Sequence, residues 1–149
     1  MSERPTIIAV DPGLTTGWAA LYPDGEFRSG ETKGSYPFLR TVHGLLSAGA
    51  FDWHVVVERY TITPETIKKS RQTEALEIIG ALKFFTQHYG AGFSMQSPAE
   101  AKSFATDAKL RRVRWFQQGL GHANDASRHL LCYAVRNGLV KPDDLMEGS

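Results

Sequence analysis

Residues 7–18 read Ile7-Ile8-Ala9-Val10-Asp11-Pro12-Gly13-Leu14-Thr15-Thr16-Gly17-Trp18, and this is the most informative stretch of the chain. Its apolar run, without polar alternation, is typical of a strand that is buried on both faces. The run ends on the carboxylate of Asp11, and a Pro-Gly turn leads into a second apolar run that begins at Trp18. A charge at the end of a central strand is costly unless it is paired or binds a metal ion. Asp11 is therefore either a functional carboxylate or the opening residue of an ordinary turn.

The composition is that of an ordinary globular protein. The chain has 149 residues, of which 42% are hydrophobic and 22% charged, and this predicts a single domain over residues 1–149. Its one cysteine, Cys132, excludes a disulfide framework and indicates a reducing, cytoplasmic setting. The longest apolar run, Leu130 to Val135, is too short to cross a bilayer, so we expect no membrane association.

The net charge of +1 conceals an uneven distribution. Residues 1–58 carry 4 basic and 7 acidic side chains, whereas residues 59–149 carry 13 basic and 9 acidic. Two segments concentrate the basic residues, the first with Arg59, Lys68, Lys69 and Arg71, and the second with Lys102, Lys109, Arg111, Arg112 and Arg114. Such clusters in a nearly neutral protein indicate a local surface for a polyanion, although a solvated helix face gives the same pattern.

The periodicity predicts an α/β fold. Short apolar or alternating runs bounded by turn signals predict strands over residues 6–10, 17–22, 26–31, 53–57 and 93–96. Helical spacing and capping signals predict helices over residues 35–48 and 72–88, a short helix after Ser97, a helix from residue 107 to about 118, and a last helix that ends near Asn137. Three sequential strands followed by alternating helices and strands predict a central five-stranded mixed sheet, flanked by helices on both faces.

Acidic residues stand at the ends of several of these elements. Asp11 ends the first strand and Glu58 the fourth, and neighbouring central strands can bring two such ends to one crevice. His122 and Asp125 share one helix face if the last helix has begun by His122. Three carboxylates and one imidazole suit Mg²⁺ and also Mn²⁺. Each residue also has a plainer explanation: a helix cap for Asp125, a solvated loop for His122, and a surface ion pair between Glu58 and Arg59.

In order and spacing, these motifs resemble the RuvC family of Holliday junction resolvases within the RNase H-like superfamily, especially its compact bacteriophage-borne members. The matching segments cover about residues 6–137 and are Ala9 to Trp18, Val56-Val57-Glu58, residues 77–82, 97–102 and 107–110, and His122-Ala123-Asn124-Asp125-Ala126-Ser127. The resemblance implies an RNase H-like fold.

The resemblance also implies an activity and a site. Asp11, Glu58, His122 and Asp125 would form a catalytic site for two Mg²⁺ ions, with Mn²⁺ able to substitute. His122 stands where family members often carry aspartate, and it is either a metal ligand or an acid-base group. The implied reaction is paired phosphodiester hydrolysis near the branch point of a four-way DNA junction. A homodimer is expected to perform it in the cytoplasm of a bacterial or phage-infected cell, with residues 72–88 at the dimer interface.

The same resemblance assigns DNA contacts to the basic segments. Lys102 and Lys109 match family lysines and would hold phosphate close to the site. Tyr60 lies on the polar loop that would enter the junction centre, where it either stacks on a base or packs against the protein. Longer-range, salt-sensitive DNA binding is expected from Arg59, Lys68, Lys69, Arg71, Arg111 and Arg112.

Three other functions fit part of the sequence. A broader endonuclease for flaps, replication forks or Y-shaped DNA is not separated from a strict resolvase by these residues. A non-catalytic DNA-structure-binding protein on the same fold would lack a metal ligand, whereas all four positions are filled here. An actin-like ATPase also begins with Asp-x-Gly, but it needs two such domains, and 149 residues hold only one.

Overall fold

Five strands form one mixed sheet in the order β3-β2-β1-β4-β5. The computed structural model describes residues 4–60, 63–65 and 73–146. Its strands are β1 (Thr6–Asp11), β2 (Thr15–Leu21), β3 (Phe27–Lys33), β4 (Trp53–Glu58) and β5 (Gly92–Gln96). β1 pairs in parallel with β4, and β4 with β5, whereas β2 is antiparallel to both β1 and β3. The predicted five-stranded mixed sheet is confirmed.

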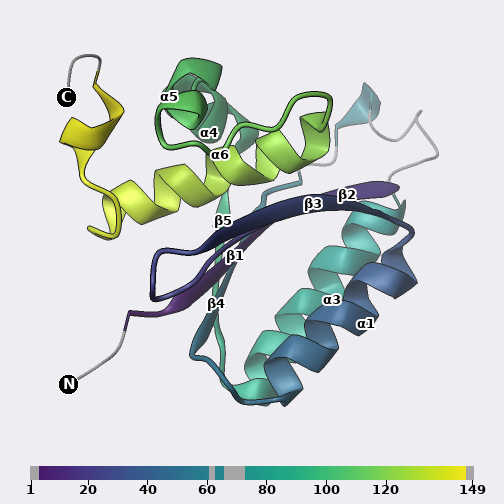
Figure 1. Ribbon diagram of the computed structural model, residues 1–149. Coiled ribbons are helices and arrows are strands. Elements are labelled where there is room, and N and C mark those ends of the chain that lie inside the picture. The colour runs from purple at the N-terminus through teal and green to yellow at the C-terminus, as the bar shows by residue number, and fades with distance from the viewer. Residues whose placement is uncertain (1–3, 61–62, 66–72, 147–149) are drawn as a thin grey trace.

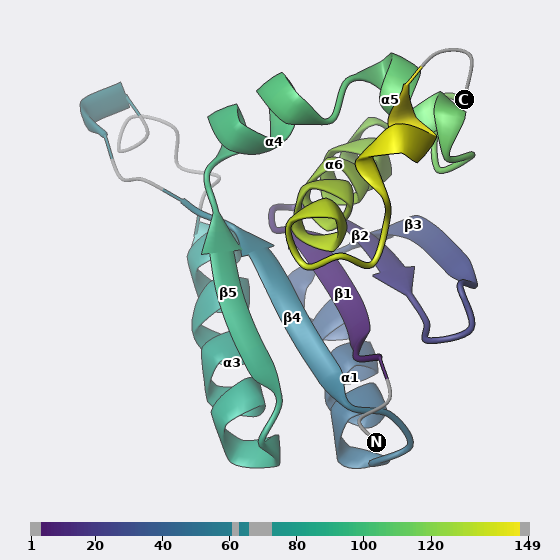
Figure 2. The same ribbon diagram turned by 90° about the vertical axis from the view of Figure 1, so that its left-hand side faces the viewer.

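Helices cover both faces of this sheet (Figure 1). α1 (Ser35–Ser47) and α3 (Thr73–Tyr89) pack on one face. The other face carries α6 (Gly121–Arg136), with α4 (Pro98–Phe104), α5 (Asp107–Arg112) and the 3-10 helix η1 (Pro142–Leu145) on the same side. Figure 2 shows β4 and β5 side by side, both running toward the end of the sheet where α4 begins. Within the described part of the chain, we find no helix with the length and apolar character needed to span a membrane.

Alternation along the central strands sorts the core into two layers. Ile7 and Ala9 of β1 and Val56 of β4 belong to the core beneath α6, whereas the residues between them in the strands face α1 and α3. Successive side chains of a strand point to opposite faces. The next residues on the α6 side are therefore Asp11 and Glu58, so the same pattern that builds the core also delivers both carboxylates beneath α6.

One helix is shorter than expected. The sequence predicted a helix from residue 107 to about 118, but α5 ends at Arg112. Arg114 takes a left-handed conformation with φ 66°, and the Trp115 N–H donates to the Leu110 carbonyl at 2.8 Å. This is a Schellman-type helix end, which usually has glycine at the left-handed position. Because arginine stands there instead, the end of the helix carried no glycine signal in the sequence.

Candidate active site

Five residues form a row across one end of the sheet, on the side that α6 covers. The strand register pairs Glu31 with Gly17, Gly17 with Asp11, and Glu58 with Gln96. The last pair between β1 and β4 immediately precedes Asp11 and Glu58, so these two residues leave neighbouring strands side by side. We call this set the cross-strand row; in order across the sheet it consists of Glu31, Gly17, Asp11, Glu58 and Gln96.

The first turn of α6 is fastened to one end of this row. The Glu31 carboxylate accepts hydrogen bonds from the backbone N–H groups of His122 at 2.8 Å and of Ala123 at 3.2 Å. The helix has Leu120 at its N-cap, and that side chain cannot accept a hydrogen bond. Glu31 therefore supplies the cap from β3, where a negative charge is also favoured by the helix dipole.

The α6 backbone rests directly on the sheet at Gly17. A Cβ atom added at Gly17 would lie only 1.8 Å from the His122 carbonyl oxygen. Every residue other than glycine would therefore push the start of α6 away from the sheet. This close approach places His122 above the carboxyl end of β1.

Asp11 lies in a concentration of negative charge. Burial is the largest cause that raises the pKa of Asp11 from its ordinary 3.8 to about 8, followed by the charges of Glu58 and Asp125. A hydrogen bond between Asp11 and Glu58 raises this pKa further, and the Lys102 ammonium lowers it. His122 Nδ1 lies 3.7 Å from Asp11 Oδ2. The structure thus brings together all four residues that the sequence grouped.

Glu58 is held by a buried histidine that the sequence reasoning missed. His129 Nε2 lies 2.9 Å from Glu58 Oε2, and His129 Nδ1 lies 3.0 Å from Gln96 Oε1. Two signals were available in the sequence. His129 follows Asp125 by four residues, which places both on one helix face, and Gln96 ends β5 just as Glu58 ends β4.

Asp125 is held in a similar way by Arg128, another residue that was not singled out. Arg128 Nε lies 3.4 Å from Asp125 Oδ1. The same guanidinium donates to the Ala105 carbonyl at 2.8 Å and pairs with the Asp107 carboxylate. Arg128 therefore ties the beginning of α6 to the turn between α4 and α5, in addition to fixing Asp125.

The donor set fits a hard divalent cation. It offers the oxygens of three carboxylates and one imidazole nitrogen, and a cation among them would relieve the repulsion that helps raise the pKa of Asp11. Across residues 4–60, 63–65 and 73–146, no three His, Cys, Asp or Glu side chains form a closed set of metal ligands. Glu58 is turned toward His129 and Asp125 toward Arg128, so one oxygen of each carboxylate is engaged by a side chain outside the donor set.

The two lysines that were predicted to hold phosphate differ in their surroundings. Lys102 is exposed on α4 and is near enough to Asp11 to lower its pKa. Lys109 instead donates to the Phe104 carbonyl at 2.8 Å, with its Nζ 4.3 Å from the centre of the Phe104 ring. Lys102 thus lies near the carboxylates, and the phosphate contacts of both lysines stay predictions.

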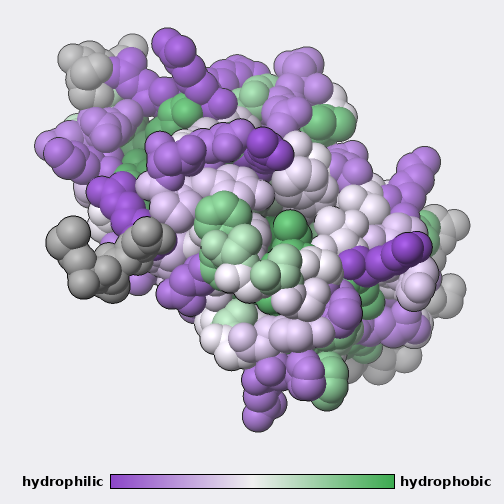
Figure 3. Space-filling view, turned by 60° about the horizontal axis from the view of Figure 1, so that its bottom comes forward, coloured by the Kyte–Doolittle hydropathy of each residue, from purple (hydrophilic) through white to green (hydrophobic). Residues whose placement is uncertain are grey.

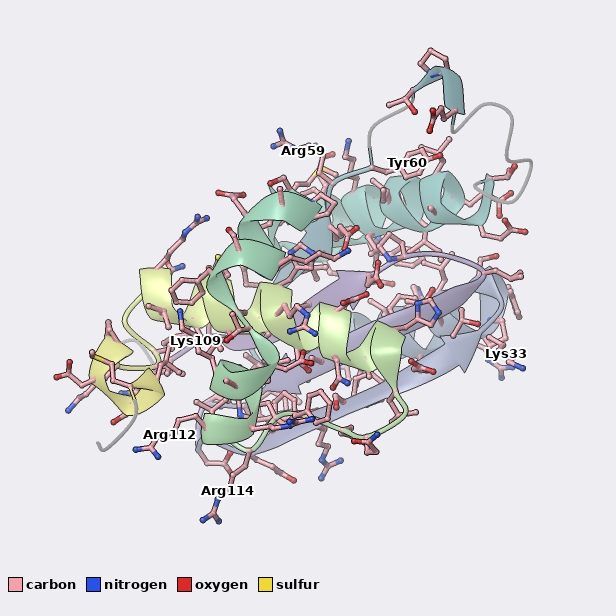
Figure 4. The ribbon with its side chains drawn as sticks, turned by 90° about the horizontal axis from the view of Figure 1, so that it is seen from above. Lys33, Arg59, Tyr60, Lys109, Arg112 and Arg114 are labelled. Carbon is pink, nitrogen blue, oxygen red and sulfur yellow. The ribbon has the colours of Figure 1, made fainter. Side chains whose placement is uncertain are left out.

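The other basic residues point outward from different edges of the molecule (Figure 4). Arg112 and Arg114 extend from α5 and the turn after it, and Arg59 lies on the opposite side of that view. The Arg111 guanidinium lies 4.2 Å from the centre of the Phe116 ring. Three more predicted DNA contacts lie outside the described residues: Lys68, Lys69 and Arg71.

Tyr60 is half-buried and packs partly against the core on the α1 and α3 side. The Arg59 N–H donates to the Gln96 carbonyl at 2.7 Å, which continues the pairing of β4 with β5 beyond Glu58. This continuation keeps Tyr60 against the protein, although the polarity of the loop had suggested an exposed residue. The structure thus shows the packing alternative, and base stacking by Tyr60 stays a prediction.

The strand order, the mixed pairing and the helices on both faces define an RNase H-like fold. The fold is similar to that of Thermus thermophilus RuvC in complex with a Holliday junction substrate, at 14% sequence identity and a TM-score of 0.62 over 91% of this chain and 98% of that one. A second structure of Thermus thermophilus RuvC gives 15% identity and a TM-score of 0.55 over 90% and 97% of the two chains. Comparison of the sequence with protein-family models and with curated proteins finds no match. The RuvC-like fold predicted from the sequence motifs is confirmed.

Proposed function

We propose that this protein is a metal-dependent, structure-selective DNA endonuclease that resolves Holliday junctions by paired cleavage near the branch point. The observation that carries the proposal is the meeting of Asp11, Glu58, Asp125 and His122 at the cross-strand row, contributed by β1, β4 and α6. The likeness to Thermus thermophilus RuvC, whose structure includes a Holliday junction substrate, supports the choice of substrate.

Asp11 is the central ligand in this proposal, with Glu58 on one side and Asp125 with His122 on the other. These side chains would hold two Mg²⁺ ions, with Mn²⁺ able to replace them. When bound, divalent ions supply Lewis-acid activation of water and of the scissile phosphate.

Side chains of the protein itself would bind the phosphate and position or deprotonate the attacking water. Lys102, close to Asp11, would pair with the phosphate that lies over the carboxylates. The His122 side chain is 55% exposed, so it can reach solvent and either complete the ligand set or move a proton at the attacking water. Its substitution by aspartate distinguishes these two roles, because aspartate can replace a ligand but titrates at a much lower pH.

We further propose that the protein acts as a homodimer, because a four-way junction has approximate twofold symmetry. The face formed by α1 and α3 is the candidate interface, in line with the expectation for residues 72–88. Large apolar side chains are exposed there, namely Tyr36 of α1 and Leu76 and Phe84 of α3. Figure 3 brings this face forward and shows apolar groups lying among polar ones. Phe84→Glu should shift the protein from dimer to monomer in light scattering, and an unchanged dimer would place the interface elsewhere.

The decisive experiment is cleavage of a sequence-matched panel of four-way, three-way, flap and linear DNA in Mg²⁺, Mn²⁺ or EDTA. We expect paired nicks near the branch point of the four-way junction in Mg²⁺ and none in EDTA. Asp11→Asn should abolish these nicks while junction binding persists. Equal cleavage of flaps and forks would identify the broader endonuclease, and binding without cleavage in either metal would identify a non-catalytic DNA-binding protein.

A further inference from the structure

We propose that His129, braced by Gln96, is a positioning residue that fixes the Glu58 carboxylate for divalent-cation binding. The inference rests on the proposed function, because it concerns the same metal site. It adds two buried side chains that lie outside the four proposed ligands.

Burial is the first reason to assign these residues a role. His129 is 1% exposed and Gln96 4% exposed, and the next two residues of α6, Leu130 and Leu131, are part of the apolar core. A polar group in such a place costs about 1–3 kcal/mol if it is left without a hydrogen-bond partner. His129 has partners at both ring nitrogens, and one of them is a proposed metal ligand.

The direction of the hydrogen bonds defines what the imidazole does. An ionised carboxylate only accepts hydrogen bonds, so His129 Nε2 donates to Glu58 Oε2 across 2.9 Å. On the other side of the ring, the Gln96 side-chain amide lies 3.0 Å from Nδ1. An amide group offers both an acceptor and donors, so Gln96 satisfies Nδ1 with or without a proton there. With both nitrogens engaged, the ring is fixed in rotation as well as in position.

The strand register makes this arrangement rigid. Glu58 and Gln96 are direct partners across β4 and β5, and His129 bridges their side chains from α6. One Glu58 oxygen is thereby held, which orients the carboxylate as a whole. Glu58 differs in this respect from His122, which is largely exposed and can be oriented by solvent and substrate. Outer partners of metal ligands typically contribute about 10- to 100-fold in metal affinity or activity.

A matched pair of variants tests the proposal. In His129→Gln, the side-chain amide nitrogen can occupy the place of Nε2 and still donate to Glu58. In His129→Asn, the shorter amide reaches only the place of Nδ1, next to Gln96. We expect isothermal titration of the full chain with Mn²⁺, in the absence of DNA, to show a loss of about 10- to 100-fold in affinity for His129→Asn. His129→Gln should recover most of that loss.

Three controls separate positioning from general destabilisation. Thr86→Val removes another buried hydrogen-bonding group, on α3, and should lower the melting temperature without weakening Mn²⁺ binding. In a protein that already carries Glu58→Gln, adding His129→Asn should change the Mn²⁺ affinity little, because His129 acts through Glu58. Gln96→Met leaves the imidazole in place and removes its brace, so it should weaken Mn²⁺ binding less than His129→Asn does.

The outcomes separate this proposal from the proposed function. If both His129 variants bind Mn²⁺ as the unsubstituted protein does, the positioning role is wrong while the metal site stands. If both lose Mn²⁺ affinity equally, or if Thr86→Val loses as much, His129 is only structural. If His129→Asn does not fold, Gln96→Met decides, and unchanged Mn²⁺ affinity in that variant overturns the positioning role. If the unsubstituted protein binds neither Mn²⁺ nor Mg²⁺, the proposed function fails, and the positioning role fails with it.

Discussion

Replacing Asp11 by asparagine should stabilise the metal-free protein at high pH, even though it removes the central residue of the site. The substitution keeps the shape of the side chain and removes its charge. The pKa of Asp11 is raised from its ordinary 3.8 to about 8, chiefly by burial. Between these values the unfolded chain has lost the proton and the folded chain retains it. The free energy of unfolding therefore falls as pH rises through this window, by up to about 1.4 kcal/mol per pH unit.

The size of the effect follows from the pH interval. The contribution of Asp11 to the free energy of unfolding is fully present below pH 3.8 and is lost as the pH rises through about 8. From pH 5 to pH 8 the full slope amounts to about 4 kcal/mol. We expect about half of this, because the Glu58 and Asp125 side chains are 23% and 35% exposed and solvent screens their charges. About 2 kcal/mol corresponds to a difference of about 4–8 °C in melting temperature for a chain of this size.

Thermal unfolding in EDTA at pH 5, 6, 7 and 8 measures this difference. Asp11→Asn should melt increasingly above the unsubstituted protein as the pH rises, with the smallest gap at pH 5. Adding Mg²⁺ at pH 8 should raise the melting temperature of the unsubstituted protein and leave Asp11→Asn unchanged. Asp52→Asn, which alters an exposed carboxylate just before β4, controls for the loss of one charge. Parallel pH curves for Asp11→Asn and the unsubstituted protein would show that the raised pKa of Asp11 does not lower the stability of the folded protein at high pH.

Four further predictions follow from contacts around the site. Gly17→Ala should destabilise the protein by about 1–3 kcal/mol in denaturant unfolding, because its methyl group meets the His122 carbonyl; an unchanged midpoint would contradict the close approach. Glu31→Ala should cost about 1 kcal/mol by removing the cap of α6. It should also weaken Mn²⁺ binding through His122, and titration with Mn²⁺ checks this second effect. Lys102→Met should reduce the cleavage rate more than junction affinity, and equal losses would place Lys102 away from the scissile phosphate. Tyr60→Ala should lower the preference for junction over linear duplex in parallel binding assays, by at most about 1–3 kcal/mol for one stacked base. Since Tyr60 is also packed against the core, some loss of stability should accompany this effect, and proportional losses on both DNAs would leave it a packing residue.

The overall fold could be predicted because each element has a local signal. The apolar runs that end at Asp11 and Glu58 identified the two central strands, and the capping box at Ser97 identified the start of α4. The five predicted strands and the helices predicted over residues 35–48 and 72–88 begin and end within two residues of the observed elements. The end of α5 was missed because Arg114 takes the left-handed conformation at the expense of local strain.

The site could be predicted only in part, because its outer residues depend on strand register. Asp11, Glu58, His122 and Asp125 were grouped by type and by their position at element ends. Nothing local relates Glu31 to the start of α6, or Gln96 to His129, since each pair is joined only after the sheet and α6 have assembled. The spacing of His129 from Asp125 and the position of Gln96 at the end of β5 are local signals, but neither relates the two residues to each other.

Because the α6 backbone packs directly on Gly17, the site can be completed only late in synthesis and folding. Asp11 and Glu58 leave the ribosome well before Asp125, and contacts between such distant segments form only after long loops have closed. Until α6 docks, the carboxylates at the ends of β1 and β4 face solvent and lack the partners that fix them. A nascent or partly folded chain therefore keeps Asp125 apart from Asp11 and Glu58. Any nuclease activity of this site begins only when the last large helix is in place.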